Sequence, residues 1–312
     1  MDRRSLLMAP LTALAAGAWP EPAYRIELWS TPPAPPRPGM RETVTDASKD
    51  PDFHHRRAQG IVRPRIEVFP AAEPNGGAVL IVPGGGFSWD SFDVEGYLLA
   101  RRLNAAGLTA CVLFYRLAND GWADRVDVGT IDAMRAMRVV RSRAAELKID
   151  PKRVAAIGFS AGGFLAASLA TRFDEALYPA RDAADALSAR PDAAALMYPV
   201  ASLDPQIAYS GAVPSLFGGA VTPEQIARYS PDRRVGARTP PCFLVQAEDD
   251  PVVPVANTIR FRAALQAHGV ADETHLFASG GHGFGMTPSD LPHRIWPDLF
   301  VNFLRQQGVA GA

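Results

Sequence analysis

Apolar and polar residues follow two different periods along the chain, and their alternation predicts the order of its elements. Runs that are continuously apolar or rich in β-branched residues are typical of strands buried in a sheet, and they stand at 65–69, 78–86, 108–115, 153–159, 193–200, 241–248 and 274–279. Helical spacing covers 94–107, 130–148, 161–173, 257–269 and 295–308. This alternation predicts a single α/β domain, with a mostly parallel central sheet and helices on both faces.

Two stretches of the chain depart from this alternation. Residues 19–60 are polar and rich in proline, which predicts an irregular N-terminal segment ahead of the α/β domain at 61–308. The stretch 203–238 is rich in Pro, Gly and Ser, and it predicts loops that overhang a site. The net charge of the 312 residues is −1, with no long run of one sign, so neither nucleic acid nor an anionic membrane is expected as a partner.

The first eighteen residues have the pattern of a secretory signal peptide. A pair of arginines at 3–4 precedes an apolar stretch at 6–16, and small residues at 16–18 form a cleavage pattern. The apolar stretch is too short to span a bilayer. We therefore expect 1–18 to be a signal peptide and the protein to be exported, periplasmic or secreted. The arginine pair resembles a twin-arginine signal, and the sequence leaves that route, the general secretory route and a frayed N-terminal helix open.

A hydroxyl group directly follows one of the buried strands, and its surroundings predict a nucleophile. Residues 158–162, Gly-Phe-Ser-Ala-Gly, have the G-x-S-x-G pattern between a strand and a helix. Such a turn projects the oxygen of Ser160, and it brings the residues two before and two after against neighbouring backbone, so both must be small. The turn also lies beyond the carboxyl end of a strand, where open α/β sheets bind ligands. The alternative is a small residue in a tight turn.

A serine hydroxyl needs a base, and the base needs an acid to orient it. Of six histidines, His282 alone lies in a glycine-rich loop after the last strand, so we choose it as the base. The acids Asp249 and Asp250 follow the strand at 241–248. We choose Asp250 as the partner of His282, with Asp249 as the alternative.

Backbone N–H groups near the serine are candidates for an oxyanion hole. The glycine loop, residues 83–87 (Pro-Gly-Gly-Gly-Phe), follows an interior strand, and its glycines let the backbone approach a substrate. We assign the N–H groups of Gly85 and Gly86, together with that of Ala161 at the start of a helix. The loop is not followed by the Lys-Ser/Thr pair or by the correctly spaced third glycine of phosphate-binding loops. This chemistry requires no metal and no redox cofactor.

With these residues identified, the chain resembles the α/β-hydrolase superfamily, and more narrowly the secreted bacterial esterases grouped with bifunctional acetylxylan and feruloyl esterases. The resemblance runs over about 61–305 and rests on VPGGGFSW, the long segment that ends in IGFSAGGFLAA, PPCFLVQAEDDPVVPVANT and SGGHGFG. It implies the order nucleophile, acid, histidine along the chain. Phe164 stands where these relatives often have histidine, and we expect a change in packing there.

The resemblance also implies an order of strands across the sheet, 1-2-4-3-5-6-7-8. Cys111 and Cys242 would then lie on the fourth and seventh strands of the chain, which are not neighbours. We therefore expect two buried thiols and no disulfide bond.

The resemblance implies a serine esterase that hydrolyses small acyl esters, acetate first, on a carbohydrate such as acetylated xylan. Phe87, Trp89 and Phe284 are candidates to stack on the sugar or to line the acyl pocket, with core packing as an equal alternative. Three other functions stay open: a peptidase of the prolyl-oligopeptidase type, a lipase, and a non-catalytic carbohydrate-binding protein on the same fold. The sequence leaves open the acyl group, the alcohol and the oligomeric state.

Overall fold

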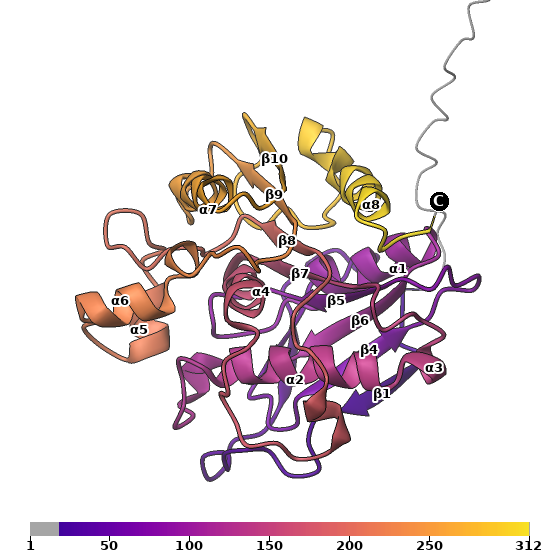
Figure 1. Cartoon of the computed structure of the whole chain (residues 1–312), viewed down its shortest axis with the longest axis horizontal. Coiled ribbons are helices and arrows are strands. Elements are labelled where there is room, and N and C mark those ends of the chain that lie inside the picture. The colour runs from indigo at the N-terminus through magenta and orange to yellow at the C-terminus, as the bar shows by residue number, and fades with distance from the viewer. Residues whose placement is uncertain (1–18, 312) are drawn as a thin grey trace, which may run out of the picture.

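Eight strands form one sheet through the middle of the molecule, as the computed structural model shows for residues 19–311, which are the residues that it describes (Figure 1). Across the sheet the strands are β1 (Tyr24–Glu27), β4 (Arg65–Phe69), β6 (Thr109–Phe114), β5 (Ala78–Val82), β7 (Val154–Phe159), β8 (Ala194–Met197), β9 (Cys242–Ala247) and β10 (Asp272–Phe277). β4 runs antiparallel to both of its neighbours, and the other pairs are parallel. This order confirms the predicted fold. The predicted signal peptide at 1–18 lies outside the described residues.

Helices cover both faces of the sheet, as the alternation of strands and helices predicted. α2 (Val128–Ser142), α4 (Ser160–Arg172) and α7 (Ala256–Ala267) pack on one face, and α1 (Leu98–Asn104) and α8 (Trp296–Gln306) pack on the other (Figure 1). A π-helical turn, η1 (Asp93–Tyr97), leads into α1. The predicted helix at 130–148 is two helices, because Arg143 separates α2 from the short α3 (Ala144–Leu147). Single 3₁₀ turns are η2 (Ala118–Asp120), η3 (Ala183–Ala186) and η5 (Pro292–Ile295).

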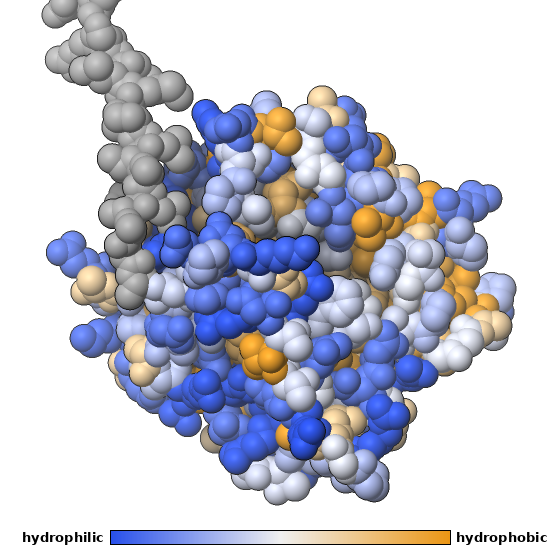
Figure 2. Space-filling view, turned by 180° about the vertical axis from the view of Figure 1, so that it is seen from behind, coloured by the Kyte–Doolittle hydropathy of each residue, from blue (hydrophilic) through white to orange (hydrophobic). Residues whose placement is uncertain are grey.

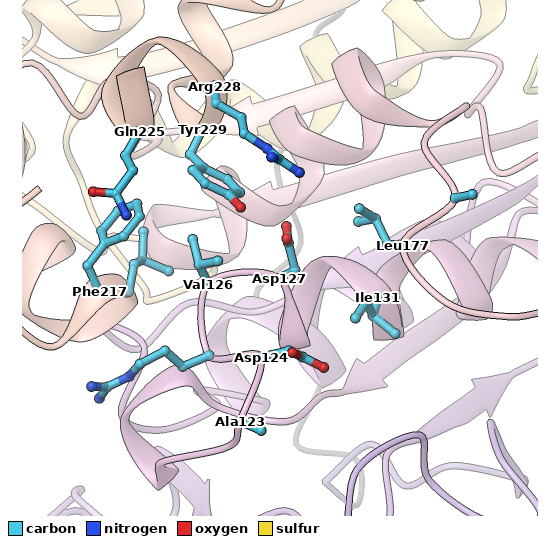
Figure 3. A pocket seen from close by; sticks show the side chains of 13 residues that line it. Ala123, Asp124, Val126, Asp127, Ile131, Leu177, Phe217, Gln225, Arg228 and Tyr229 are labelled. Atoms are coloured by element: carbon cyan, nitrogen blue, oxygen red, sulfur yellow. The ribbon is translucent and has the colours of Figure 1, made fainter. Parts of the chain in front are cut away.

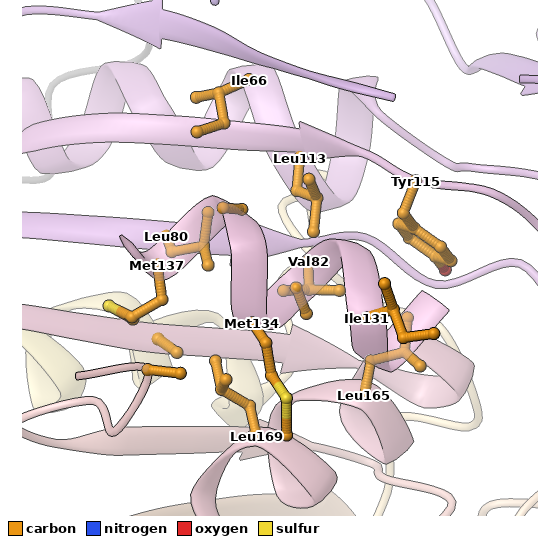
Figure 4. Close-up of a cluster of buried hydrophobic side chains, with 14 of the residues drawn as sticks. Ile66, Leu80, Val82, Leu113, Tyr115, Ile131, Met134, Met137, Leu165 and Leu169 are labelled. Atoms are coloured by element: carbon orange, nitrogen blue, oxygen red, sulfur yellow. The ribbon is translucent and has the colours of Figure 1, made fainter. Parts of the chain in front are cut away.

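The hydrophobic core has two main halves because successive residues of a strand point to opposite faces of the sheet. In β5, Leu80 and Val82 belong to the half beneath α2 and α4, whereas Val79 and Ile81 belong to the half beneath α1 and α8. Burial on both faces explains why this strand is continuously apolar. Figure 4 shows the first half, where side chains of the sheet meet those of the two helices: Ile66, Leu80, Val82, Leu113, Tyr115, Ile131, Met134, Met137, Leu165 and Leu169.

The N-terminal segment 19–60 contains three strands. The prediction that this segment is irregular is therefore wrong for those three stretches. β1 adds an edge strand to the main sheet, and β2 (Thr43–Asp46) pairs with β3 (Arg56–Gln59) in a separate two-stranded sheet. An isolated bridge between Ala58 and Asp90 joins this hairpin to the loop after β5. Polar strands such as β2 and β3 have no apolar alternation, so their sequences carry little signal of a strand.

The stretch 203–238 also contains helices that its composition did not predict. They are α5 (Ala212–Phe217), α6 (Pro223–Tyr229) and the 3₁₀ turn η4 (Pro231–Arg233). A readable signal did precede α6: the side chain of Thr222 accepts the N–H of Gln225, and the Gln225 side chain accepts the N–H of Thr222. This capping box, with proline in the first turn, is a typical helix start.

The two cysteines lie on strands that are far apart in the sheet. Cys111 on β6 and Cys242 on β9 are both buried and free, with three strands between them, which confirms the prediction of two separate thiols.

Figure 2 shows one face of the molecule that is mostly hydrophilic, with hydrophobic residues scattered on it and more frequent toward its right rim. Among residues 19–311, no helix has the length and apolar character needed to cross a membrane.

Asp90 is a buried carboxyl group in the loop that follows β5. In the part of the chain that the structure describes, neither of its side-chain oxygens has a hydrogen-bond partner. Burial raises the pKa of Asp90 well above its usual range; the charge of Arg65 opposes the rise, and Glu67 and Glu95 add to it. The folded state therefore keeps this proton to a higher pH than the unfolded chain does.

We predict that the substitution Asp90→Asn makes stability less dependent on pH. Because the pKa of Asp90 is higher in the folded state than in the unfolded chain, its protonation contributes to the free energy of unfolding. This contribution is fully present below the unfolded pKa and is lost as the pH rises toward the folded pKa. One retained proton makes this loss at most about 1.4 kcal/mol per pH unit, and the variant has no such proton. Urea unfolding of both proteins between about pH 5 and about pH 8 measures the difference. Parallel profiles for the two proteins would contradict the assignment.

Candidate active site

Ser160 stands on a sharp turn between β7 and α4, with a φ of +51°. A residue other than glycine rarely adopts this conformation, so the surrounding structure must hold it. The turn is tight enough that a Cβ on Gly158 would lie 2.2 Å from the carbonyl oxygen of Gly162. A Cβ on Gly162 would lie 2.2 Å from the carbonyl oxygen of Val82. Both positions therefore require glycine, for the reason that the sequence pattern predicted.

Ser160, His282 and Asp250 form one hydrogen-bonded series. The Ser160 Oγ lies 2.8 Å from Nε2 of His282, and Nδ1 of that ring lies 2.7 Å from Oδ2 of Asp250. The Asp250 side chain is wholly buried, and its Oδ1 accepts the backbone N–H groups of Val252 and Val253, each at 2.9 Å. These bonds orient the carboxylate toward the imidazole, as a base that activates a serine requires.

Asp249, the alternative acid, has a different position. Its Oδ1 accepts the backbone N–H of Gly281 at 2.8 Å, so it holds the histidine loop, residues 279–285, next to the residue that carries the ring. Tyr198 holds the ring from another side, with an edge-on contact of 5.0 Å between ring centroids. The structure therefore brings Asp250, and not Asp249, to the imidazole.

The glycine loop lies beside the serine, where an oxyanion hole would be needed. Gly85 and Gly86 line the same pocket as Ser160, and within residues 19–311 their N–H groups donate to no acceptor. Ala161 is the second residue of α4, where backbone N–H groups have no partner inside the helix. The N–H of Gly84 is different, because it donates to Glu95. The three groups that the sequence analysis chose thus remain available to a ligand.

Glu95 is a buried carboxylate that the sequence analysis missed. It accepts the N–H of Gly84 at 2.7 Å and the hydroxyl of Tyr198 at 2.8 Å. The same hydroxyl oxygen accepts the N–H of Gly285 at 3.0 Å. The pKa of Glu95 is raised, because the effect of burial exceeds that of the two hydrogen bonds and of the charge of His282, which act in the opposite direction. One carboxylate thus connects the glycine loop with the histidine loop, and the signal in the sequence was a lone acid inside an apolar helical segment.

A pocket of about 320 Å³ opens at Ser160 and His282. The hairpin of β2 and β3 contributes His55 and Arg57, and Tyr209 comes from the stretch 203–238. The Nε2 atom of His55 lies 2.9 Å from the hydroxyl oxygen of Ser91, which also lines the pocket. The prediction that loops of 203–238 overhang the site therefore agrees with Tyr209. The N-terminal segment, to which the sequence analysis gave no role at the site, forms one side of it.

The three aromatic residues chosen as substrate contacts have different positions. Trp89 lines the pocket, with the guanidinium of Arg57 5.0 Å from its ring centroid. Phe87, the last residue of the glycine loop, is buried and packs edge-on against Phe164. The change in packing expected at Phe164 relative to proteins with histidine there stays a prediction. Phe284 is buried and stacks on His293 at 4.5 Å. The assignment of Phe87 and Phe284 to the substrate is wrong, because both side chains belong to the core.

A second, larger hollow of about 570 Å³ lies between the start of α2 and the helices α5 and α6 (Figure 3). Figure 3 shows Tyr229 and Arg228 of α6 on one side of it and Asp127 and Ile131 on the other. Neither the serine nor the histidine of the triad lines this hollow, so we place the reaction in the smaller pocket. In the described part of the chain, no three His, Cys, Asp or Glu side chains gather as a metal site requires.

Residues 79–286 match a family described as having the alpha/beta hydrolase fold. The chain belongs to this α/β hydrolase family. The matched region begins in β5 and contains all three residues of the hydrogen-bonded series.

Relatives of this α/β hydrolase have names that refer to xylan and its esters. An acetylxylan esterase of Xylanibacter ruminicola is 33% identical over 222 residues, which are 70% of this chain and 43% of that protein. Endo-1,4-beta-xylanase B of Butyrivibrio fibrisolvens is 29% identical over 248 residues, which are 80% of this chain and 39% of that protein. The chain thus spans about two fifths of the length of these curated relatives.

A solved structure is similar over nearly the whole chain. It is the acetyl ester-xyloside bifunctional hydrolase of Caldicellulosiruptor lactoaceticus, with 30% identity and a TM-score of 0.76. The similarity covers 95% of this chain and 100% of that one. These likenesses confirm the resemblance to acetylxylan esterase-like carbohydrate esterases that the sequence motifs indicated.

We predict that Gly162→Ala destabilises the protein even though the position is helical. In an exposed helix this exchange stabilises by up to about 1 kcal/mol. Here the added Cβ meets two backbone carbonyl oxygens at 2.2 Å and 2.3 Å, so the free energy of unfolding should fall by about 1–3 kcal/mol. Gly236→Ala is the matched control, because no heavy atom of residues 19–311 lies within 4 Å of its Cβ position. Urea unfolding measures both, and equal stabilities of the two variants would contradict the close approach.

Proposed function

We propose that this protein is a carboxylic ester hydrolase that uses Ser160 as its nucleophile. The observation that carries the proposal is the hydrogen-bonded series from Ser160 through His282 to Asp250, next to free N–H groups of a glycine loop. Nucleophile, base and acid have the spacing that acyl transfer through a serine requires. The names of the relatives, acetylxylan esterase above all, support ester hydrolysis.

In the first half of the proposed reaction, the Ser160 hydroxyl attacks the carbonyl carbon of an ester. Nε2 of His282 takes the hydroxyl proton, and Asp250 stabilises the charged ring. The oxygen of the former carbonyl group becomes negative, and the N–H groups of Gly85, Gly86 and Ala161 hold it. His282 then gives its proton to the leaving alcohol, and the acyl group stays on the serine oxygen.

In the second half, a water molecule takes the place of the alcohol. His282 removes a proton from the water as its oxygen attacks the acyl carbon. The negative oxygen of the tetrahedral intermediate accepts hydrogen bonds from the same N–H groups. The bond between the acyl carbon and the serine oxygen then breaks. The histidine returns the proton to Ser160, and the free acid leaves. One ester and one water thus give one alcohol and one acid.

The substrate that we infer is a small acyl ester, acetate first, on a carbohydrate such as acetylated xylan. A pocket of about 320 Å³ has room for a short acyl group and part of a sugar, but it lies at the small end of ligand sites. Trp89 contributes an aromatic side chain to the lining of this pocket. Export through the segment 1–18 stays a prediction, and it would bring the enzyme to a polysaccharide outside the cytoplasm.

We predict that Ser160→Ala abolishes hydrolysis of p-nitrophenyl acetate, with a fall in kcat of about 10⁴-fold or more, because the variant has no oxygen to acylate. Wild type should prefer the acetate to the butyrate and the octanoate, and it should release acetate from acetylated xylan. Ser142→Ala, at the exposed end of α2, is the control and should keep full activity.

Other outcomes would assign another function. A preference for octanoate would indicate a lipase, and cleavage of peptide p-nitroanilides without ester turnover would indicate a peptidase. Binding of xylan without labelling of Ser160 by an organophosphonate would indicate a non-catalytic binding protein.

We further predict that Glu95→Gln lowers kcat by about 10-fold to 100-fold and changes KM much less, because a small displacement of the glycine loop weakens contacts that form in the transition state. The glutamine has one acceptor oxygen for two donors, Gly84 and Tyr198, so one of the two bonds is lost. Glu146→Gln, on an exposed pair with Arg143, is the control. Steady-state kinetics with p-nitrophenyl acetate measures the effect, and an unchanged kcat would show that Glu95 does not position the loop.

A further inference from the structure

Two consecutive arginines on β3 have different environments. Successive residues of a strand point to opposite sides. Arg56 forms a two-pronged pair with the buried carboxylate of Asp93, with Nε and Nη2 at 3.0 and 2.9 Å from its oxygens. Arg57 lines the pocket of Ser160 and has no carboxylate within 4 Å in the described part of the chain. Arg56 therefore holds the hairpin in place, and Arg57 is left for another partner.

The guanidinium of Arg57 is both oriented and incompletely satisfied. It lies over the ring of Trp89 at 5.0 Å, a contact that fixes its plane. Its Nε is buried and, among residues 19–311, has no hydrogen-bond acceptor. The buried Nε leaves this side chain short of one acceptor. Because Arg57 also lines the pocket, its remaining guanidinium donors are open to an acceptor that a ligand supplies there.

Among residues 19–311, no other titratable group that lines the pocket forms an ion pair with this guanidinium. The charges of Glu95 and Arg57 act on each other, but the two oxygens of Glu95 accept hydrogen bonds from Gly84 and Tyr198 and not from Arg57. Burial lowers the pKa of His55, and the charge of Arg57 lowers it further, so this ring stays neutral near neutral pH. His282 is committed to Ser160 and Asp250. Arg57 is therefore the fixed positive charge of the pocket lining that the structure describes.

We propose that Arg57 binds a carboxylate of the substrate, so that the enzyme prefers esters that carry an acidic group. The inference rests on the proposed esterase function and narrows its substrate class. A planar guanidinium donates two parallel hydrogen bonds to the two oxygens of a carboxylate. A neutral sugar hydroxyl has one oxygen and no charge, so it cannot form this pair. The carboxylate has two possible sources, a uronic acid on the alcohol side or the free end of a dicarboxylic acyl group.

The test compares acidic and neutral substrates that are otherwise matched. For the alcohol side, the pair is an acetylated xylo-oligosaccharide with and without a glucuronic acid branch. For the acyl side, the pair is p-nitrophenyl hemisuccinate and p-nitrophenyl butyrate. Each protein gives a ratio of kcat/KM for the acidic substrate over kcat/KM for the neutral one, and this ratio is the measured quantity.

In the arm that contains the true source, the ratio should fall by about 10-fold to 100-fold in Arg57→Gln, because a charged hydrogen bond is lost. Arg57→Lys keeps the charge and loses the fork, so its ratio should lie between those of the other two proteins. Arg63→Gln is the matched control: Arg63 is exposed, lies outside the pocket and pairs with Glu27, so the ratio should stay as in wild type.

The outcomes separate this inference from the proposed function. A lower ratio in the uronic acid arm assigns the carboxylate to the alcohol, and a lower ratio in the hemisuccinate arm assigns it to the acyl group. An unchanged ratio in both arms overturns the role of Arg57, while turnover of the neutral esters leaves the esterase function intact.

A second measurement does not depend on turnover. Calorimetry measures binding of a glucuronic acid-branched xylo-oligosaccharide and of its unbranched counterpart to Ser160→Ala and to the double variant with Arg57→Gln. Tighter binding of the acidic sugar that is lost in the double variant supports the inference even if no ester is hydrolysed. The inference is overturned if the two sugars bind Ser160→Ala with equal affinity and the kcat/KM ratio in the hemisuccinate arm is also the same in wild type and Arg57→Gln. Circular dichroism confirms that each variant is folded.

Discussion

The contact between the start of α4 and the end of β5 is the constraint on which the site depends. The backbone at Gly162 lies so close to the carbonyl oxygens of Val82 and Pro83 that a single methyl group has no room. This approach holds Ser160 in its strained conformation and puts the first turn of the helix next to the glycine loop. The proposed nucleophile and the proposed oxyanion donors thus follow two neighbouring parallel strands, and the spacing of those strands sets their separation.

A buried carboxylate extends this arrangement to the third part of the site. The histidine loop follows β10 at the edge of the sheet, far along the chain from the glycine loop. Glu95 and Tyr198 connect the two loops through hydrogen bonds at Gly84 and Gly285. Because buried polar groups need partners, displacement of one loop would leave donors unsatisfied in the other. The geometry of the candidate site is therefore fixed by these buried hydrogen bonds as well as by the strands.

The sequence predicted the parts of the molecule that obey a period or a tight local rule. Buried strands and amphipathic helices have such periods, and the glycines around Ser160 follow from sterics. The polar hairpin of β2 and β3 has neither, and its conformation depends on contacts with the loop after β5. Phe87 shows a second limit: it has a φ of +65° and its buried side chain packs against Phe164, a direction that its nearness in sequence to the candidate site does not reveal.

The attachment of the hairpin has a consequence for local stability. Its contacts to the rest of the chain include the bridge of Ala58 to Asp90 and the pair of Arg56 with Asp93, both in or next to one loop. Segments held by few buried contacts open at lower free energy than the core of a sheet. We therefore expect the hairpin to open at a lower free energy than the main sheet, whose strands carry the candidate triad. Under mild heat or denaturant, the proposed contact of Arg57 with a substrate would then be lost before the candidate triad is.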